Sequence, residues 1–285
     1  MLVSEGLSLI VVILLLSSGV FLALRLLPGD PTSLILGDDA SQQARELMRH
    51  RLGLDEPLVR QWTRFIQGII VGEWGESLAK PGVSAISAVA AALAPTASLA
   101  GLAVAQGSSM GILLSVLSVG LRERGRRMAH ATIMLVAAVP LLAFGPLLTF
   151  VLAVRYHLVP LPGDPDSGTC GLLFASTLLS IPLGAQVARV SRAALLDQQR
   201  ARYLEVARAK GAGPARIWVL HALPVAAPAI VVVIAMQLGA LLGGAVVLER
   251  LFERPGLGTL MLEAYRARDL PILQASIVSA GMLFI

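Results

Sequence analysis

The chain has 285 residues, of which 56% are hydrophobic and only 14% are charged, and its mean hydropathy is +0.77. This composition excludes an ordinary soluble domain and predicts an all-α, polytopic membrane protein. The net charge of +5 does not indicate a nucleic-acid partner, because the arginines gather in short loops between apolar runs. The single cysteine, Cys170, excludes an internal disulfide, and we expect neither redox chemistry nor a metal cluster.

Five apolar runs are long enough to cross a hydrocarbon layer of about 30 Å at about 1.5 Å per residue, and a sixth begins near residue 274. We expect one domain, 1–285, with six transmembrane helices at about 7–27, 95–121, 128–154, 171–190, 224–248 and 274–285. The last run stops too soon to cross, so we expect that the natural protein continues or that this sequence is a shortened form. Pro140 and Pro146 predict a kink in the third span.

The segment between the first two spans is polar and forms a predicted outer loop, 28–93, in which no run is long enough to span. A helix is expected from Ser41 to Leu52, ended by Gly53, and a second helix is expected after an Asp55 cap. The second helix carries an apolar stripe that includes Trp62 and Phe65. The stripe suits internal packing, a membrane-interface belt or a platform for a partner protein.

Basic residues predict which loops lie in the cytoplasm. Arg122–Arg127 holds four arginines, and the segment from Arg189 to His221 holds seven basic residues against two acidic ones. The positive-inside rule places both loops in the cytoplasm. The N-terminus is then cytoplasmic, and 28–93, 155–170 and 249–273 lie outside.

A polar, basic hairpin, YLEVARAKGAGPARIWVLHALP, joins the fourth and fifth spans from Tyr203 to Pro224. We expect a short helix up to Lys210, a stop at Gly211 and a second helix that begins at Gly213-Pro214. A charged insert at a membrane boundary is either a surface that another protein binds or a basic anchor that fixes topology. Both interpretations stay open on these residues alone.

The hairpin resembles the cytoplasmic signature loop of bacterial ABC importer permeases. Glu205, Ala207, Gly211 and the pair Leu223-Pro224 stand at the spacing of that loop, whereas Val206 replaces an Ala and His221 replaces an Ile. The strings ARAKG and HAL are similar to the dipeptide, oligopeptide and nickel branch. Further blocks resemble that branch in the same order: RLLPGDP (25–31), LGLDEP (52–57), GEWGESL (72–78) and ERLFERPGLGTLMLEAYRARDLPILQA (249–275).

This resemblance implies the type I importer fold, a multi-pass location in the bacterial inner membrane and a loop that docks on an ATPase. The implied partners are a second homologous permease, two ABC ATPase subunits, an extracytoplasmic substrate-binding protein and the lipid bilayer. No cofactor is expected in this chain, while ATP and Mg are expected in the partner subunits. The expected ATPase-coupling residues are Glu205, Ala207, Arg208, Ala209, Lys210, Gly211, Leu223 and Pro224. The small alanines are expected to let the partner's backbone approach.

Peptides are the expected cargo by resemblance, with nickel or a metal chelate as the alternative. The rival functions are an ATP-independent secondary transporter or channel and a structural membrane subunit without a path. Secondary transporters often show repeat halves and ionisable groups at the midplane of the membrane, and neither is evident in this sequence. No HExxH, Walker A or GxSxG motif occurs, so the chain is not expected to be an enzyme.

Polar and small residues inside the spans are candidates for the translocation path. Gln106, Gln186 and Gln237 either line a path or form hydrogen bonds to neighbouring helices. The GxxxG motifs at 107–111 and 239–243 are typical of packing seams. Gly239 and Gly243 are alternatively a smooth face that slides as a cavity opens, which makes them path candidates as well.

Overall fold

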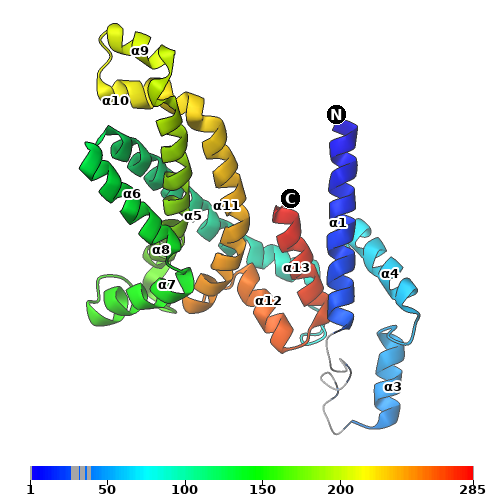
Figure 1. The fold of residues 1–285 in the computed structure, drawn as a ribbon. Coiled ribbons are helices and arrows are strands. Elements are labelled where there is room, and N and C mark those ends of the chain that lie inside the picture. Colours follow the sequence, from blue (N-terminus) through cyan, green and yellow to red (C-terminus); the bar gives the residue numbers. More distant parts are fainter. Residues whose placement is uncertain (1, 27–31, 33–35, 37–39, 285) are drawn as a thin grey trace. The chain divides into compact units, whose positions relative to one another are not determined.

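A computed structural model describes residues 2–26, 32, 36 and 40–284 of the chain. Regular structure in these ranges is helical, apart from an isolated antiparallel bridge between Glu76 and Ser84. Backbone contacts divide the chain into two compact units, the first formed by Met1–Thr96 with Pro255–Ile285 and the second by Ala97–Arg254. The single permease domain stays a prediction, and the two units are described separately (Figure 1).

The first unit contains α1 (Leu2–Arg25), α3 (Gln42–Arg51), α4 (Leu58–Val71), the start of α5 (Ala85–Gly120), α12 (Leu257–Arg266) and α13 (Leu270–Phe284). Helix α13 packs against both α1 and α12, and α4 packs against α1. Val20, Leu24, Val89, Leu257 and Val278 are among the buried apolar residues of its core. Burial of these side chains supplies the packing that holds elements from both ends of the sequence together.

The second unit contains the rest of α5, α6 (Glu123–Ala138), α7 (Leu141–Thr149), the π-helix η1 (Phe150–Arg155), the 3₁₀ turn η2 (Pro165–Ser167), α8 (Gly168–Asp197), the 3₁₀ turn η3 (Gln198–Arg200), α9 (Arg202–Ala209), α10 (Pro214–Arg216), the π-helix η4 (Ile217–Ala222) and α11 (Leu223–Leu251). Helix α8 is its central element and packs against α6, α7 and α11. Leu178, Leu179, Leu183 and Leu195 of α8 are almost completely buried. Their burial explains why α8 is the least solvent-exposed of the long apolar helices.

Four helices in the described ranges are long and apolar enough to cross a membrane: Leu7–Arg25, Ala85–Gly120, Gly168–Arg200 and Pro214–Leu241. A fifth candidate is the pair formed by Glu123–Ala138 and Leu141–Arg155. The expected sixth span corresponds to the shorter apolar helix α13. Together these helices confirm the all-α, polytopic class.

Two predicted features of the spans differ from the structure. Helix α5 begins at Ala85, ten residues before the expected start, with Pro95 inside the helix. The Thr96 hydroxyl donates to the Ala92 carbonyl (3.3 Å) beside the proline, a side-chain bond of the kind that lets membrane helices tolerate proline. The expected kink in the third span is a break of 93° at Pro140. It breaks there because the residue before a proline avoids helical backbone angles, and Val139 is extended.

The helices expected in 28–93 form as α3 and α4. The Ser41 side chain caps α3 by accepting from the Ala44 amide (3.3 Å), and Gly53 adopts the left-handed conformation expected of a stop. The expected Asp55 cap is wrong, because Pro57 occupies the cap position of α4 and restricts the residue before it. The block RLLPGDP falls mostly on 27–31, which lie outside the described residues.

A buried carboxylate joins two of the sequence blocks within the first unit. Asp269, which is 3% exposed, accepts hydrogen bonds from the Ser77 hydroxyl and from the amides of Leu78 (3.1 Å) and Ala79 (3.3 Å). It also accepts from the Ile272 amide (3.4 Å) in the first turn of α13. One side chain therefore accepts hydrogen bonds from donors that lie about 190 residues apart in the sequence. Asp269 directly precedes α13, and the N-terminus of a helix favours negative charge.

We predict that Asp269→Ala destabilises the protein by about 2 kcal/mol or more, because it leaves buried donors without an acceptor. Thermal unfolding of the detergent-solubilised protein and its abundance in membranes measure the effect. Asp55→Ala, at an exposed position of the same unit, is the matched control and should change little. Equal stability of the two variants would show that Asp269 does not hold the blocks together.

Candidate functional site: a helical hairpin and the pockets between the helices that it joins

The hairpin from α9 to α10 begins with a short helix that ends in a well-defined cap. The Gly211 amide donates to the Arg208 carbonyl (2.9 Å), and the Ala212 amide donates to the Ala207 carbonyl (3.0 Å). This pair of bonds, with Gly211 at φ +81°, is the Schellman motif, which satisfies the last carbonyls of a helix. The structure thus explains the expected stop at Gly211 by a backbone angle that glycine adopts without a Cβ penalty.

The hairpin rests on a small apolar core of its own chain. Leu204 of α9 is fully buried, and Ile217 and Trp218 of η4 are 5% and 8% exposed in the same cluster. Leu195, near the end of α8, is fully buried in that cluster as well. Because its inner face is packed on the ends of the helices that it connects, the hairpin has little freedom to move independently of them.

Most of the expected coupling residues lie on the outer face of the hairpin. Glu205 is in the first turn of α9, and Arg208, Ala209 and Lys210 are exposed in its last turn or just beyond it. These charges complement the helix dipole, negative at the N-terminus and positive at the C-terminus. A partner that docks here would meet a short helix with charges at both ends.

Two of the expected coupling residues face inward instead. Ala207 is only 6% exposed, because it lies three residues after Leu204 on the same face of α9. It therefore cannot offer a small surface to a partner, as the sequence suggested, although Ala209 can. Leu223 packs against the core of the second unit, whereas Pro224 is exposed at the start of α11.

Proline also shapes the connection between the hairpin and α11. The Leu223 amide donates to the Trp218 carbonyl, five residues back, at the end of the π-helix η4. Pro224 follows directly and has no amide hydrogen to donate, so a regular α-helical bond is lost at this point. His221 Nδ1 lies 3.2 Å from the Arg216 carbonyl, again five residues back. At the start of α9, the Tyr203 hydroxyl donates to Gln198 Oε1 (3.2 Å), and burial of the phenol raises the pKa of Tyr203 above its usual value.

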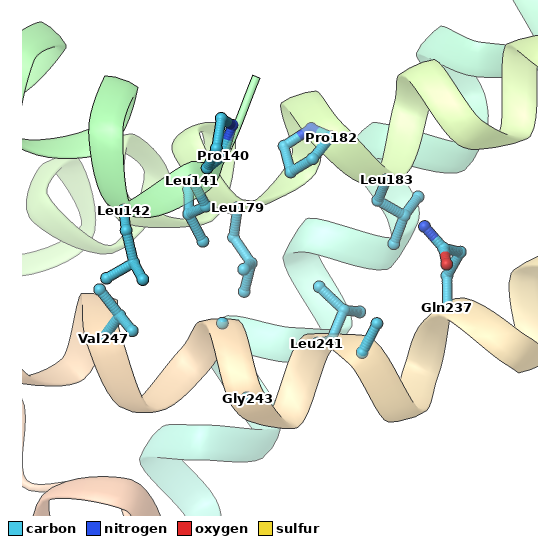
Figure 2. A pocket seen from close by; sticks show the side chains of 12 residues that line it. Pro140, Leu141, Leu142, Leu179, Pro182, Leu183, Gln237, Leu241, Gly243 and Val247 are labelled. Atoms are coloured by element: carbon cyan, nitrogen blue, oxygen red, sulfur yellow. The ribbon is translucent and has the colours of Figure 1, made fainter. Parts of the chain in front are cut away.

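The two helices that the hairpin joins, α8 and α11, line two pockets in the second unit. The first, of about 330 Å³, lies between α7, α8 and α11, and Figure 2 shows its side chains converging from these helices. Gln237 is the one polar side chain among its described lining residues, and Gly243 lies on the same helix. The second pocket, of about 570 Å³, lies between α8 and α11 and is lined by Gln186, Arg189 and Gln237. Gln237 thus lies where both pockets meet.

The three predicted glutamines have different surroundings. Gln106 Oε1 of α5 accepts from the hydroxyls of Ser176 (3.2 Å) and Thr177 (3.4 Å) of α8, so it bonds a neighbouring helix. Gln186 Oε1 is buried, and no described residue donates a hydrogen bond to it. The second pocket brings Gln186 and Gln237 together, whereas Gln106 is hydrogen-bonded to α8 and lines neither pocket.

The two GxxxG motifs also differ. A Cβ built on Gly107 would lie 2.8 Å from the Ser180 carbonyl oxygen, and one on Gly111 would lie 2.6 Å from the Gly184 carbonyl oxygen. These glycines form a close seam between α5 and α8. A Cβ built on Gly243 would meet no atom within 4 Å, so this glycine opens onto the pocket instead. Gly239 of the same motif is half-buried.

Residues 107–285 match the family described as binding-protein-dependent transport system inner membrane component, and residues 1–86 match the N-terminal region of such components. The chain is 33% identical to the probable peptide ABC transporter permease protein y4tP of Sinorhizobium fredii, over 93% of this chain and 87% of that protein. It is also 33% identical to the glutathione transport system permease protein GsiC of Shigella boydii and of Escherichia coli, over 98% of this chain and 90% of those proteins. The chain belongs to this permease family. It is the transmembrane subunit of an ABC importer and a multi-pass protein of the inner membrane.

Several residues that form the core under the hairpin or line the first pocket were not predicted from the sequence. Trp218, Leu204 and Leu195 form the core under the hairpin, and Leu179 and Leu183 line the first pocket. The spacing of three residues between Leu204 and Ala207 was an available signal for the inner face of α9. No comparable signal marks the pocket leucines, because apolar residues occupy every face of a membrane helix.

We predict that Gly111→Ala destabilises the permease by about 1 to 3 kcal/mol, because the new methyl group meets backbone atoms of α8. The matched Gly243→Ala change adds the same group in open space and should leave stability unchanged. Membrane abundance and thermal unfolding in detergent measure both variants. A Gly111→Ala protein as stable as the parent would show that α5 and α8 do not pack closely at Gly111.

Proposed function

We propose that the permease forms half of the translocation path of a peptide importer and is driven through its α9–α10 hairpin. One observation carries the proposal: the hairpin is packed rigidly on the ends of α8 and α11, and these same helices line both pockets. A force applied to the hairpin therefore acts on the walls of the pockets. The peptide cargo is supported by the peptide permease among the relatives, which fits this interpretation better than nickel or a metal chelate.

The proposed partners would bind ATP, deliver cargo and complete the translocation path. Two ABC ATPase subunits would bind ATP and Mg and would hold the hairpins, while an extracytoplasmic binding protein would deliver cargo. A second homologous permease would complete the path. Closure of the ATPases on ATP would then bias the helices toward one of two arrangements, which is the physical content of alternating access.

Within this scheme each residue has a stated role. Glu205, Arg208 and Lys210 would form charged hydrogen bonds with the ATPase, and Ala209 would allow close approach of its backbone. Gly211 would keep the turn in the shape that the ATPase accepts. Gln186, Gln237 and the Gly239–Gly243 face would border the path, with Gln237 offering hydrogen bonds to a passing peptide group.

The proposed orientation follows the distribution of charge. Arg122–Arg127 and the hairpin lie in the cytoplasm together with the N-terminus, and 28–93 lies outside. This arrangement presents the hairpin to cytoplasmic ATPases. It also leaves α3 and α4 on the side from which a binding protein would approach.

We predict that Gly211→Val and Ala209→Trp both sharply reduce ATPase binding and transport while the permease still inserts. The valine strains a left-handed position by about 1 kcal/mol or more, and the tryptophan adds bulk on the exposed face of α9. Co-purification of the ATPase and ATP-dependent peptide uptake, each at equal membrane abundance, measure the effect. Ala207→Trp is not a suitable test, because its buried position would disturb the fold itself.

Gly213→Ala is the control for the glycine change. Gly213 has φ −67° and open space around a built Cβ, so an alanine there should leave coupling nearly intact. If both Gly211→Val and Ala209→Trp retained normal ATPase association and uptake, the hairpin would be a topological anchor only. Uptake that persisted after the partner ATPase was inactivated would favour an ATP-independent transporter.

We predict from the orientation that an impermeant thiol reagent applied outside labels a cysteine at Asp55 and not one at Arg126. Cys170 is exposed and must first be replaced by serine, because it would otherwise react by itself. Asp55→Cys and Arg126→Cys are then compared in intact cells and in opened membranes. Labelling of the Arg126 position in intact cells would overturn the topology.

A further inference from the structure

A third pocket lies in the first unit, where α4 packs against α1. Trp62 Nε1 donates to the Ser18 hydroxyl (3.0 Å), and the rings of Phe65 and Phe21 stack with centroids 5.8 Å apart. Ser18 and Phe21 belong to the apolar run Leu7–Arg25 that is long enough to span a membrane. Helix α4 is therefore held against the membrane-spanning part of α1, rather than free in the outer medium.

The exposed surface beside this contact is apolar. Leu22 and Leu26 of the α1 end are 53% and 83% exposed, and Leu58 and Val59 of α4 are 56% and 71% exposed. Side chains of this kind favour contact with lipid chains when they flank a spanning helix. The pocket, of about 270 Å³, is lined by Phe21 and Arg25, which directly precede Leu22 and Leu26 in the chain, so acyl chains along these leucines would lie close to it.

The lining of this pocket includes a cation that has no carboxylate partner among the described residues. The Arg25 guanidinium lies 5.4 Å from the centre of the Phe21 ring, and its Nε atom is buried without a hydrogen-bond partner among the described residues. The other lining arginine, Arg64, is already bound to both oxygens of Glu56 (2.7 and 2.8 Å). Glu73, also in the lining, is exposed. Arg25 is therefore the lining cation best placed to bind an anion.

A second polar group in the lining is also only partly used. Gln61 is 8% exposed, and its Nε2 donates to the carbonyls of Leu54 (3.2 Å) and Glu56 (2.7 Å). These two bonds fix the orientation of the amide and leave Oε1, a buried acceptor, without a donor among the described residues. The pocket thus combines a cation for an anionic group with an acceptor for a hydroxyl or ammonium group.

We propose that this pocket binds the headgroup of a membrane phospholipid. The lipid phosphate accepts from the Arg25 guanidinium, a headgroup hydroxyl or ammonium group donates to Gln61 Oε1, and the acyl chains lie along the exposed leucines of α1. A free phosphate or a cargo carboxylate would satisfy Arg25 alone and would not use the apolar border. The orientation proposed above places this pocket at the outer leaflet, whereas lipid binding itself does not depend on that orientation.

Native mass spectrometry of the purified, delipidated importer, titrated with phosphatidylglycerol, tests the proposal. This probe carries both a phosphodiester and headgroup hydroxyls. Arg25→Gln should weaken retention of one lipid per copy of the permease by about tenfold or more, because a charge-assisted hydrogen bond is lost. Arg25→Lys keeps the charge without the planar fork and should give an intermediate loss. Arg60→Gln, at an exposed position of α4 outside the pocket lining, removes the same charge and should bind like the parent.

Competition distinguishes the sources of the anion. Diacylglycerol, which lacks the phosphate, should bind the parent and Arg25→Gln proteins equally weakly, and millimolar inorganic phosphate should not displace the lipid. Equal phosphatidylglycerol retention in the parent and Arg25→Gln proteins would overturn the proposal. Displacement by inorganic phosphate or by a cargo peptide would also overturn it, in favour of a free-anion or cargo site. Because the measurement reads lipid retention, a failure of the coupling hypothesis would not affect it.

Discussion

In the proposed mechanism, transport depends on the contact between the hairpin and the ends of α8 and α11. A partner that holds the hairpin can move a membrane helix only if the connection between the hairpin and that helix is stiff. Leu204, Ile217 and Trp218 provide this stiffness by filling the space under the hairpin with buried apolar side chains. The Schellman cap at Gly211 fixes the turn between α9 and α10. A loosely tethered loop with the same charges would bind a partner without moving anything.

The second unit contains one close helix contact, between α5 and α8, and one that is interrupted by pockets, between α8 and α11. Helices α5 and α8 meet through Gly107, Gly111 and Gly184 with almost no space between their backbones, which makes them one rigid element. Between α8 and α11 the packing is interrupted by two pockets, with Gln237 where the pockets meet. Space into which α11 could move relative to α8 is therefore present at the pockets, whereas α5 and α8 leave none at these glycines. The seam that changes during transport is expected to be the one that contains the pockets.

The first unit is organised by polar contacts that apolar packing alone would not specify. Asp269 ties the segment after α4 to the start of α13, and Trp62 ties α4 to α1. In an apolar setting an unpaired donor or acceptor is costly, so such contacts select one arrangement of short helices over many that bury similar area. This explains why segments 72–78 and 249–275, which resemble blocks of peptide-branch permeases, come together although they are far apart in the chain.

The sequence by itself determined the membrane class, the approximate positions of most spans, the hairpin and its stop at Gly211. These features depend on composition, on local charge and on backbone preferences of single residues, all of which act over a few positions. Tertiary structure alone decided that Gln106 bonds α8 while Gln186 and Gln237 share a pocket, and that Gly243 opens onto space. It also decided the break at Pro140, where the sequence supported only a kink. In a membrane helix nearly every side chain is apolar, so the pattern along the chain does not distinguish the face that meets lipid from the face that meets another helix, and only packing does.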